Sequence, residues 1–394
     1  MHCSGPSPSR KPVPTSPRCL ESIRALIPWA FSLDTLPMSE TVPEASYRVP
    51  ESHFSSKLIG YLRRHPILAL FLLSPGIPEY LSGSSSLAFI ILNPLLFLLL
   101  LGLNMGLYCS GVLLIREAKL RWHKGWSSVF LLGFAYAIVE EGLALMTLYN
   151  PNSPVVGTLG IYGHWLGVNW VWTVGLLLFH SVFSIALPIL LFNLAFPSLA
   201  SKSLVSRRKL GWPIAALSID TVLLSFISNY WPGSSIIVLS AVAAAAFTIA
   251  ARKLPSNFLR PSSVLPSRGP LTIAVIGALF FPAVILGEAL AESASAPPVV
   301  PMIVNFLVAL ALVRLAYRFV GREQNQTHKV ALAAGLLVPV AAFGLIASLG
   351  TIPLVLGADA ALVLFTRRLW QKAQVLGLKQ FVPLKLGIDP TRVS

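Results

Sequence analysis

Charged residues are scarce in this sequence. Asp, Glu, Lys and Arg make up 11% of the 394 residues, whereas soluble domains average about 25%. Hydrophobic residues reach 55%, and the mean hydropathy is +0.74. So few charges cannot cover the water-facing surface of a globular protein of this size, which excludes a soluble enzyme. The composition therefore predicts an integral membrane protein.

Cysteines and the common catalytic motifs are also missing or few. Cys3, Cys19 and Cys109 are too few for a disulfide framework or a paired metal motif. The sequence contains no HExxH zinc motif, no Walker A loop and no GxSxG nucleophile elbow. The sequence thus indicates no metal site, leaves the cofactor unknown and offers no soluble catalytic domain.

Apolar runs long enough to cross a bilayer, about 20 residues each, recur along the chain. The predicted fold class is an all-α, polytopic helical bundle of about ten transmembrane helices. The weakest is the first, which Pro75, Pro78 and Glu79 interrupt. The predicted spans are 65–82, 91–115, 126–149, 170–195, 212–231, 234–251, 271–291, 298–317, 330–349 and 351–369.

Positive charge is abundant relative to negative charge, with 30 Lys and Arg against 15 Asp and Glu, a net charge of +15. Basic clusters near 63–64, 116–124, 202–209, 252–268, 318–329 and 367–372 alternate with span-connecting loops that have no Lys or Arg. Because cytoplasmic loops accumulate positive charge, both termini are predicted to face the cytoplasm, in a plasma membrane. Basic residues spread over six segments argue against a nucleic-acid partner.

Three regions follow from this pattern. Residues 1–57 are a Pro/Ser-rich tail that we expect to be disordered and cytoplasmic, without a cleavable signal. Residues 58–370 form the transmembrane domain, and residues 371–394 a basic cytoplasmic tail. Met1 and Met38 both remain possible starts.

Ionisable residues inside the predicted spans are candidates for function, because burying each one costs about 2.5–3.5 kcal/mol on insertion scales. Glu140 and Glu141 lie about nine residues from the outer end of their predicted span, roughly 13 Å deep at the helical rise. His180 lies about ten residues inside the next span, roughly 15 Å deep. Consecutive spans are antiparallel, so these three side chains are predicted to share one level.

Helical spacing predicts two polar stripes around these residues. Tyr136, Glu140 and Thr147 fall on one face, at i, i+4 and i+11. The other face carries Thr173, His180 and Ser184, at i, i+7 and i+11. Glu141 points about 100° away from Glu140, so we expect a second partner, or protonation, for it. A purely structural Glu–His pair that binds two helices together remains an alternative.

Other polar residues extend the candidate site. The loop 150–169 could roof a polar cavity over the acids, and its His164 is a candidate binding residue or an interfacial side chain. Asp220, near the middle of the fifth span, would suit a cation or proton path, or could pair with a neighbouring Ser or Asn. The predicted substrate-binding residues are Tyr136, Thr173, Ser184, His164 and Asp220.

Residues 126–195 resemble the CPBP-type intramembrane endopeptidases (CAAX processing and bacteriocin protection), which carry an EExxxR motif followed by an FxxxH motif. Glu140-Glu141 matches the acidic pair, and His180 follows about one helix later. The resemblance implies that Glu140 activates water and that His180 assists. Leu145 replaces the motif Arg, Leu176 replaces the Phe, and Ser184 follows His180 where the family's other histidine motif has Asn or Asp.

Three functions stay open at this point. The first is a secondary transporter or permease in which Glu140, Glu141 and His180 relay a proton or cation. The second is a glutamate-dependent intramembrane hydrolase of CPBP-like type, and the third is a non-catalytic membrane scaffold. The expected partners are the lipid bilayer and an unknown small-molecule, ion or membrane-peptide substrate, with an unknown oligomeric state.

Overall fold

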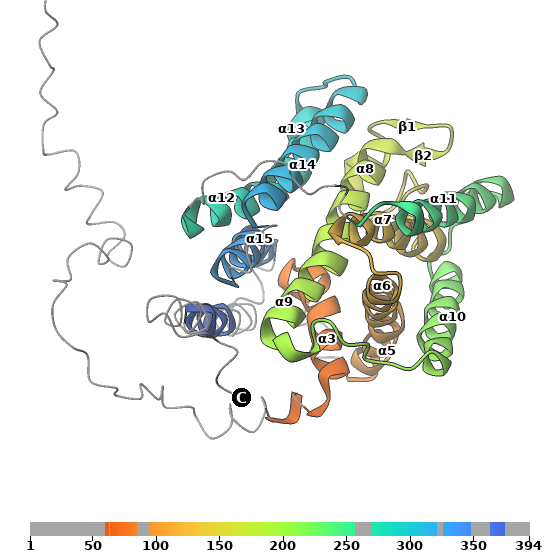
Figure 1. The fold of residues 1–394 in the computed structure, drawn as a ribbon. Coiled ribbons are helices and arrows are strands. Elements are labelled where there is room, and N and C mark those ends of the chain that lie inside the picture. The colour runs from red at the N-terminus through yellow and green to blue at the C-terminus, as the bar shows by residue number, and fades with distance from the viewer. Residues whose placement is uncertain are drawn as a thin grey trace, which may run out of the picture. The chain divides into compact units, whose positions relative to one another are not determined.

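The computed structural model describes residues 60–62, 64–84, 94–256, 258, 269–320, 326–347 and 363–374. All of them belong to one unit, Lys57–Ser394, and within the described residues this unit consists of helices, their connecting turns and one short hairpin (Figure 1). The predicted tails lie outside the described residues, except for residues 371–374. So does most of the predicted span 351–369, including Asp359.

Helices dominate the described part of the chain, which confirms the predicted all-α class. Most of them follow one another with little interruption, so that several consecutive elements make one span. The main helices are α3 (Pro66–Pro75) with η1 (Gly76–Leu81); α5 (Pro94–Asn104), η2 (Met105–Cys109) and α6 (Ser110–Arg121); α7 (Trp126–Ala137) and η3 (Ile138–Ala144); α8 (Trp170–Phe179), η5 (His180–Ala186) and α9 (Leu187–Ala195); α10 (Gly211–Ile227); α11 (Ser234–Lys253); α12 (Pro270–Phe281), η8 (Pro282–Leu286) and α13 (Gly287–Ser293); α14 (Val299–Val320); and α15 (Gln326–Ala347).

Eight helical stretches in the described part are long and apolar enough to cross a membrane, and each overlaps a predicted span. The first predicted span appears as the shorter apolar helix Pro66–Leu81. Residues 363–374, at the end of the tenth predicted span, are helical as well. The eight stretches are Leu98–Arg121, Trp126–Ala144, Trp170–Ala195, Arg208–Ile227, Ser234–Lys253, Pro270–Ser293, Val299–Arg318 and Gln326–Ile346.

Two of these stretches form the centre of the bundle. Trp126–Ala144 is 72% buried and Trp170–Ala195 is 78% buried, whereas the three stretches that contain α10, α11 and α14 are each 17% buried. α7 packs against η5 on one side and α11 on the other, and α12 pairs with α15 (Figure 1). The two central stretches carry Glu140, Glu141 and His180, so the candidate site lies inside the bundle.

A very close approach holds the two central stretches together. A Cβ atom at Gly133 of α7 would lie 2.5 Å from the Cα of Ser181 on η5, closer than real Cβ contacts. Glycine therefore lets the backbones of α7 and η5 touch, as small residues do in membrane helix pairs. The contact lies about two turns from Glu140 and next to His180, and it sets the distance between the acids and the imidazole.

Five segments of the spans are π-helical: η1, η2, η3, η5 and η8. Proline accounts for some of them, because it cannot donate to the carbonyl four residues earlier and its ring clashes there. Pro188 follows η5, and Pro282 begins η8. η3, which carries both central glutamates, contains no proline. Such π-helical turns are frequent at functional sites.

Several predicted span boundaries differ from the helix ends by a few residues, and two of these differences change the surroundings of buried charges. The span predicted at 126–149 ends as a helix at Ala144, because Met146 adopts a left-handed conformation with φ 59°. The span predicted at 91–115 continues to Arg121. Its last turns bury Arg116 and Glu117, each 1% exposed, as an ion pair with 3.5 Å between Nη1 and Oε1.

The segment between the two central stretches folds back over η3. It contains the short helix η4 (Gly157–Gly160) and a hairpin of β1 (His164–Trp165) and β2 (Val168–Asn169). Leu166 and Gly167 form its turn with φ 52° and 77°, the two positive φ angles that tight hairpins favour. The hairpin places Asn169 immediately before Trp170, the first residue of α8.

Candidate functional site

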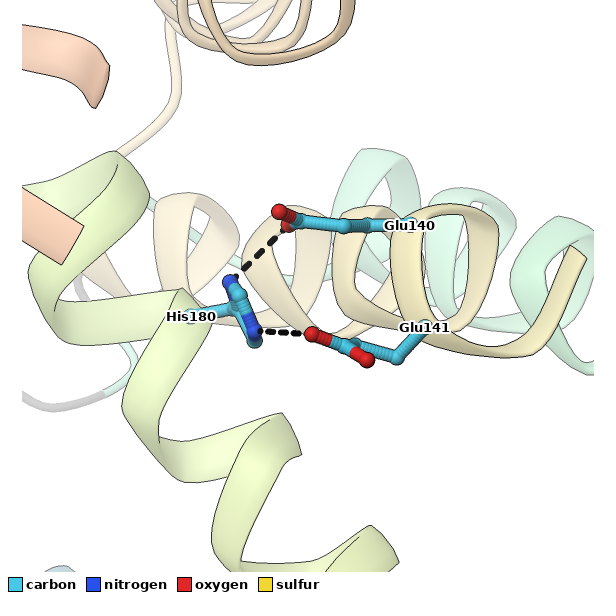
Figure 2. A group of neighbouring side chains, drawn as sticks. All are labelled: Glu140, Glu141 and His180. Atoms are coloured by element: carbon cyan, nitrogen blue, oxygen red, sulfur yellow. Dashed lines mark hydrogen bonds and ion pairs between the residues drawn. The ribbon is translucent and has the colours of Figure 1, made fainter. Parts of the chain in front are cut away.

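An imidazole lies between two carboxylates at the centre of the bundle (Figure 2). Nδ1 of His180 is 2.9 Å from Oε2 of Glu140, and Nε2 is 3.0 Å from Oε1 of Glu141. The exposed fractions are 3% for His180, 0% for Glu140 and 7% for Glu141. The structure thus brings together the three residues predicted to share one level.

The position of Glu141 differs from the sequence-based expectation. Both glutamates contact the same histidine, which the helical spacing did not predict, and Glu141 also has the expected second partner, the hydroxyl of Thr147. The acids lie on the π-helical turn η3, which is wider than an α-helical turn, so the spacing of a regular helix does not apply to them. An imidazole also has a nitrogen on each side of its ring, and so it contacts two carboxylates that approach from different directions.

The depth of the acids also differs from the prediction. The helix ends at Ala144, four residues after Glu140 rather than nine. The acids are nevertheless buried, because the following segment packs over them. Gly142 permits this packing: a Cβ there would lie 2.7 Å from the hydroxyl of Tyr149, which hydrogen-bonds to Ser240 on α11.

Two tyrosines accompany Glu140. Tyr136, 4% exposed, stacks edge-on against His180 with 6.4 Å between ring centroids. Tyr136 and Tyr108 both interact electrostatically with Glu140. Oε2 of Glu140 has its ion-pair contact with Nδ1 of His180, whereas Oε1 of Glu140 and the hydroxyl of Tyr136 have no hydrogen-bond partner among the described residues. Buried carboxylates are normally satisfied, so Glu140 has acceptor capacity to spare.

Glu141 is connected to the overlying hairpin. The hydroxyl of Thr147 donates a hydrogen bond to its Oε2. The carbonyl of Thr147 in turn accepts a hydrogen bond of 2.8 Å from Nδ2 of Asn169, which is fully buried. The side-chain oxygen of Asn169 lies 2.5 Å from Nδ1 of His164. A polar network therefore runs from Glu141 to the hairpin.

Thr147 therefore contacts Glu141, and not Glu140 as the predicted polar stripe implied. The sequence placed it on the face of Glu140, by counting regular helical turns. The chain leaves the helix at Leu145 and turns at Met146, so the count of residues fails and Thr147 reaches Glu141 instead.

Of the remaining predicted residues, Ser184 and His164 connect with the cluster, whereas Thr173 and Asp220 do not. Ser184 joins the cluster, since its hydroxyl is 2.9 Å from Nδ1 of His180. His164 reaches it only through Asn169. Thr173 is buried, but its hydroxyl has no hydrogen-bond partner in the described part of the chain. Asp220 packs against Gly106 of η2, where a Cβ would clash with its carboxylate, and it is not among the described residues that hydrogen-bond or ion-pair with His180.

A further hydrogen-bonded pair, which sequence patterns do not predict, lies on the side of Glu140. The hydroxyl of Tyr108 on η2 donates a hydrogen bond to Glu79 on η1. In the sequence, Glu79 stands out only because it interrupts the weakest predicted span, and nothing singles out Tyr108. Their contact joins helices 29 residues apart in sequence, and no local pattern encodes it.

Another buried acid lies apart from the cluster. Glu288 of α13 is 1% exposed and accepts a 2.9 Å hydrogen bond from Nδ2 of Asn305 on α14. The absence of a side chain at Gly175 on α8 makes room for its carboxylate. Glu288 and Asn305 lie 17 residues apart on successive helices, and no local sequence pattern links them.

Glu140, Glu141 and His180 are also the residue types that bind divalent metal ions. Each offers one ligand atom, and these atoms lie within 4.8 Å of one another. Carboxylate and imidazole suit Zn²⁺, Mn²⁺ and similar ions. In the arrangement described here, the imidazole contacts both carboxylates directly, which is the geometry of a hydrogen-bonded or proton-sharing cluster.

Comparison with known proteins places the chain in a family without assigning an activity. No curated protein and no solved structure matches it. The comparisons give no support to the resemblance with the CPBP-type endopeptidases. One family model matches residues 68–382, which include both central stretches and all three residues of the cluster. The chain, an integral multi-pass membrane protein, therefore belongs to an uncharacterized membrane protein family.

Proposed function

We propose that the protein is a secondary transporter or permease in which Glu140, His180 and Glu141 relay protons across the middle of the bundle. The observation that carries the proposal is the bridging of two buried glutamates by one imidazole, at 2.9 and 3.0 Å. Chains of Glu and His inside membranes typically serve as proton relays, and their burial cost is otherwise hard to justify.

The relay step is balanced in protons. A proton on Glu140 passes to Nδ1 of His180, and the proton on Nε2 leaves to Oε1 of Glu141. The imidazole then holds the opposite tautomer, in which Nδ1–H can donate to the hydroxyl of Ser184 at 2.9 Å. The step leaves Glu140 ionised and Glu141 protonated. A new cycle begins once Glu141 has released its proton and the ring has turned so that its N–H again faces Glu141 and its free nitrogen faces Glu140. The acceptor capacity to spare on Glu140 suits a group that receives a proton from elsewhere.

Polar groups continue from the cluster in two directions. On one side, Tyr108 interacts with Glu140 and hydrogen-bonds to Glu79. On the other side, Thr147 connects Glu141 with Asn169. Hydroxyls and carboxylates can pass protons, so Glu79 and Thr147 are the entry and exit candidates closest to the cluster. This continuity favours the relay over an isolated structural ion pair.

A second candidate is the glutamate-dependent intramembrane hydrolase. It is favoured by Oε1 of Glu140, which has no hydrogen-bond partner in the described part, since such a carboxylate can activate water beside an imidazole. The similarity of Glu140-Glu141 and His180 to the CPBP-type motifs points the same way. Against it, none of the three cluster residues lines the cavity of about 600 Å³ that lies between α7, α9, α12, α14 and α15.

Proton flux in proteoliposomes tests the relay. Wild-type protein should dissipate an imposed pH gradient, and Glu140→Gln, Glu141→Gln and His180→Ala should each slow dissipation at least tenfold. Glu288→Gln is the matched control, because Glu288 is a buried membrane carboxylate outside the cluster, and this variant should keep the wild-type rate.

The same variants separate the other functions. Cleavage of a membrane-embedded peptide by wild type but not by Glu140→Gln, without proton flux, would replace the relay with the hydrolase. Flux of Na⁺ or of a divalent cation in place of protons would assign the cluster to a cation path. Wild-type behaviour of all three cluster variants would leave the cluster a structural contact, as in a scaffold.

A further inference from the structure

A cavity of about 600 Å³ lies between helices of the bundle. Residues of α7, η5, α9, α12, α14 and α15 line it. Cavities of this size are typical of small-molecule sites. None of the residues proposed for the relay lines it, so it requires a separate explanation.

The two ends of the cavity differ in chemistry. Polar and basic residues line one end, where α6 ends, α7 begins, α14 ends and α15 begins: Lys119, Lys124, Ser201, Ser256, Tyr317 and Lys329. The other end is apolar, with Val182, Phe280 and Leu336. Val182 lies 13 residues before the end of α9 at Ala195, roughly 20 Å along the helix. The cavity therefore extends from a basic end deep into the apolar bundle.

The basic end carries positive charge without local compensation. Its three lysines, Lys119, Lys124 and Lys329, are accompanied by no Asp or Glu in the lining. None of the ion pairs within the described residues involves them. Lys119 lies 5.5 Å from the ring centre of Trp126, and Lys124 donates to the carbonyl of Leu254 at 2.8 Å. Three ammonium groups at one helix-end level would attract an anion.

The combination restricts the chemistry of the occupant. A soluble anion would fill the basic end and leave the apolar end empty, whereas an alkane would leave the lysines without a counter-charge. A phospholipid with an acidic headgroup satisfies both ends at once. Basic pockets between transmembrane helices on the cytoplasmic side bind such headgroups, and the charge pattern of the sequence predicts that this end is cytoplasmic.

We propose that this cavity binds one anionic phospholipid. The phosphate lies at Lys119, Lys124 and Lys329, with the hydroxyls of Ser201 and Ser256 as additional donors. An acyl chain extends between η5 and α12 toward Val182 and Phe280. The proposal is independent of the relay, because it uses none of its residues.

Lipid retention tests the proposal. The protein is placed in nanodiscs with equal amounts of phosphatidylglycerol and phosphatidylcholine of identical acyl chains, released into the gas phase, and weighed by native mass spectrometry. Wild type should retain one phosphatidylglycerol in clear preference to phosphatidylcholine. The triple variant Lys119→Gln/Lys124→Gln/Lys329→Gln should bind phosphatidylglycerol at least tenfold more weakly, as measured by titration of the detergent-purified protein.

Matched variants separate the site from general electrostatics and from misfolding. Lys202→Gln/Lys209→Gln/Lys253→Gln removes three exposed lysines that do not line the cavity, and should bind as wild type does. Ala316→Phe keeps every lysine but adds a bulky side chain to the lining of the cavity, and should also lose the lipid. Equal retention of both lipids by wild type, or wild-type affinity in the lysine triple variant or in Ala316→Phe, would overturn the proposal.

Discussion

At the scale of single residues, the net charge of the cluster of Glu140, His180 and Glu141 limits the protonation states that it can adopt. Two ionised glutamates and one protonated imidazole carry a net charge of −1, and burying an uncompensated charge in a bilayer is expensive. One extra proton shared among Glu140, His180 and Glu141 makes the cluster neutral. Interacting groups of this kind titrate as a unit rather than as separate residues. A proton that belongs to the group rather than to one residue is the property that a relay needs.

A double-mutant cycle measures this interdependence. His180→Ala leaves two buried carboxylates facing each other without the imidazole, and should destabilise the protein strongly. Adding Glu141→Gln removes one of the like charges, so the double variant should be less destabilised than the sum of the single variants. We expect a coupling energy of about 1–3 kcal/mol from unfolding in detergent. Additivity of the two single effects would show that the contacts in Figure 2 carry no energy.

The sequence predicted the three central residues but not their surroundings. Their similar depths in two consecutive spans, which must be antiparallel, predicted that Glu140, Glu141 and His180 lie at one level. The partners of the cluster depend on chain geometry that a regular helix does not have. Thr147 reaches Glu141 only because the helix ends early, and Tyr108 meets Glu79 across two separate spans.

At the scale of elements, the contact between α7 and η5 positions the chemistry. The backbone of Ser181 lies against Gly133, and no larger residue fits between the two. The π-helical turns η3 and η5 then direct the acids and the imidazole toward each other (Figure 2). Pro188 is a readable signal for η5, whereas η3 contains no comparable residue, so its irregular turn was not predictable.

Gly133→Leu tests the role of this contact. The added side chain must displace the backbone of η5, which moves His180 away from the glutamates. Overpacking of this kind typically costs 1–3 kcal/mol, and we expect a lower melting temperature together with loss of proton flux. Gly102→Leu is the control, because a Cβ at Gly102 meets nothing within 4 Å. Flux at the wild-type rate in Gly133→Leu would mean that the spacing of the two helices does not matter.

At the scale of the whole molecule, hydropathy predicts which segments enter the membrane but not where they lie in the bundle. The stretch Trp170–Ala195 has a hydropathy of 2.3 and is 78% buried, whereas Val299–Arg318 has the same hydropathy and is 17% buried. Lipid and a protein core are equally apolar, so composition does not distinguish a central helix from a peripheral one. In the described part of the chain, eight of the ten predicted spans appear as helices long and apolar enough to cross a membrane. Which helix packs against which could not be predicted from hydropathy.

The orientation of the protein in the membrane can be tested at this scale. Val155, 74% exposed in the segment before the hairpin, and Lys202, exposed after α9, lie in loops predicted on opposite sides of the membrane. In a cysteine-free background, a membrane-impermeant thiol reagent applied to intact cells should label Val155→Cys. Lys202→Cys should react only after permeabilisation. The reverse pattern would contradict a cytoplasmic location of the basic loops and of the lysine-lined cavity end.

The most direct measurement of the central claim is the protonation of the cluster itself. Infrared difference spectra between acidic and alkaline pH, recorded on reconstituted protein, report the carbonyl stretch of protonated carboxylic acids. We predict a pH-dependent carboxyl band in wild type that is lost or shifted in Glu140→Gln and in His180→Ala, and unchanged in Glu288→Gln. A pH-dependent carboxyl spectrum identical in wild type, Glu140→Gln and His180→Ala would contradict a proton relay at Glu140, His180 and Glu141.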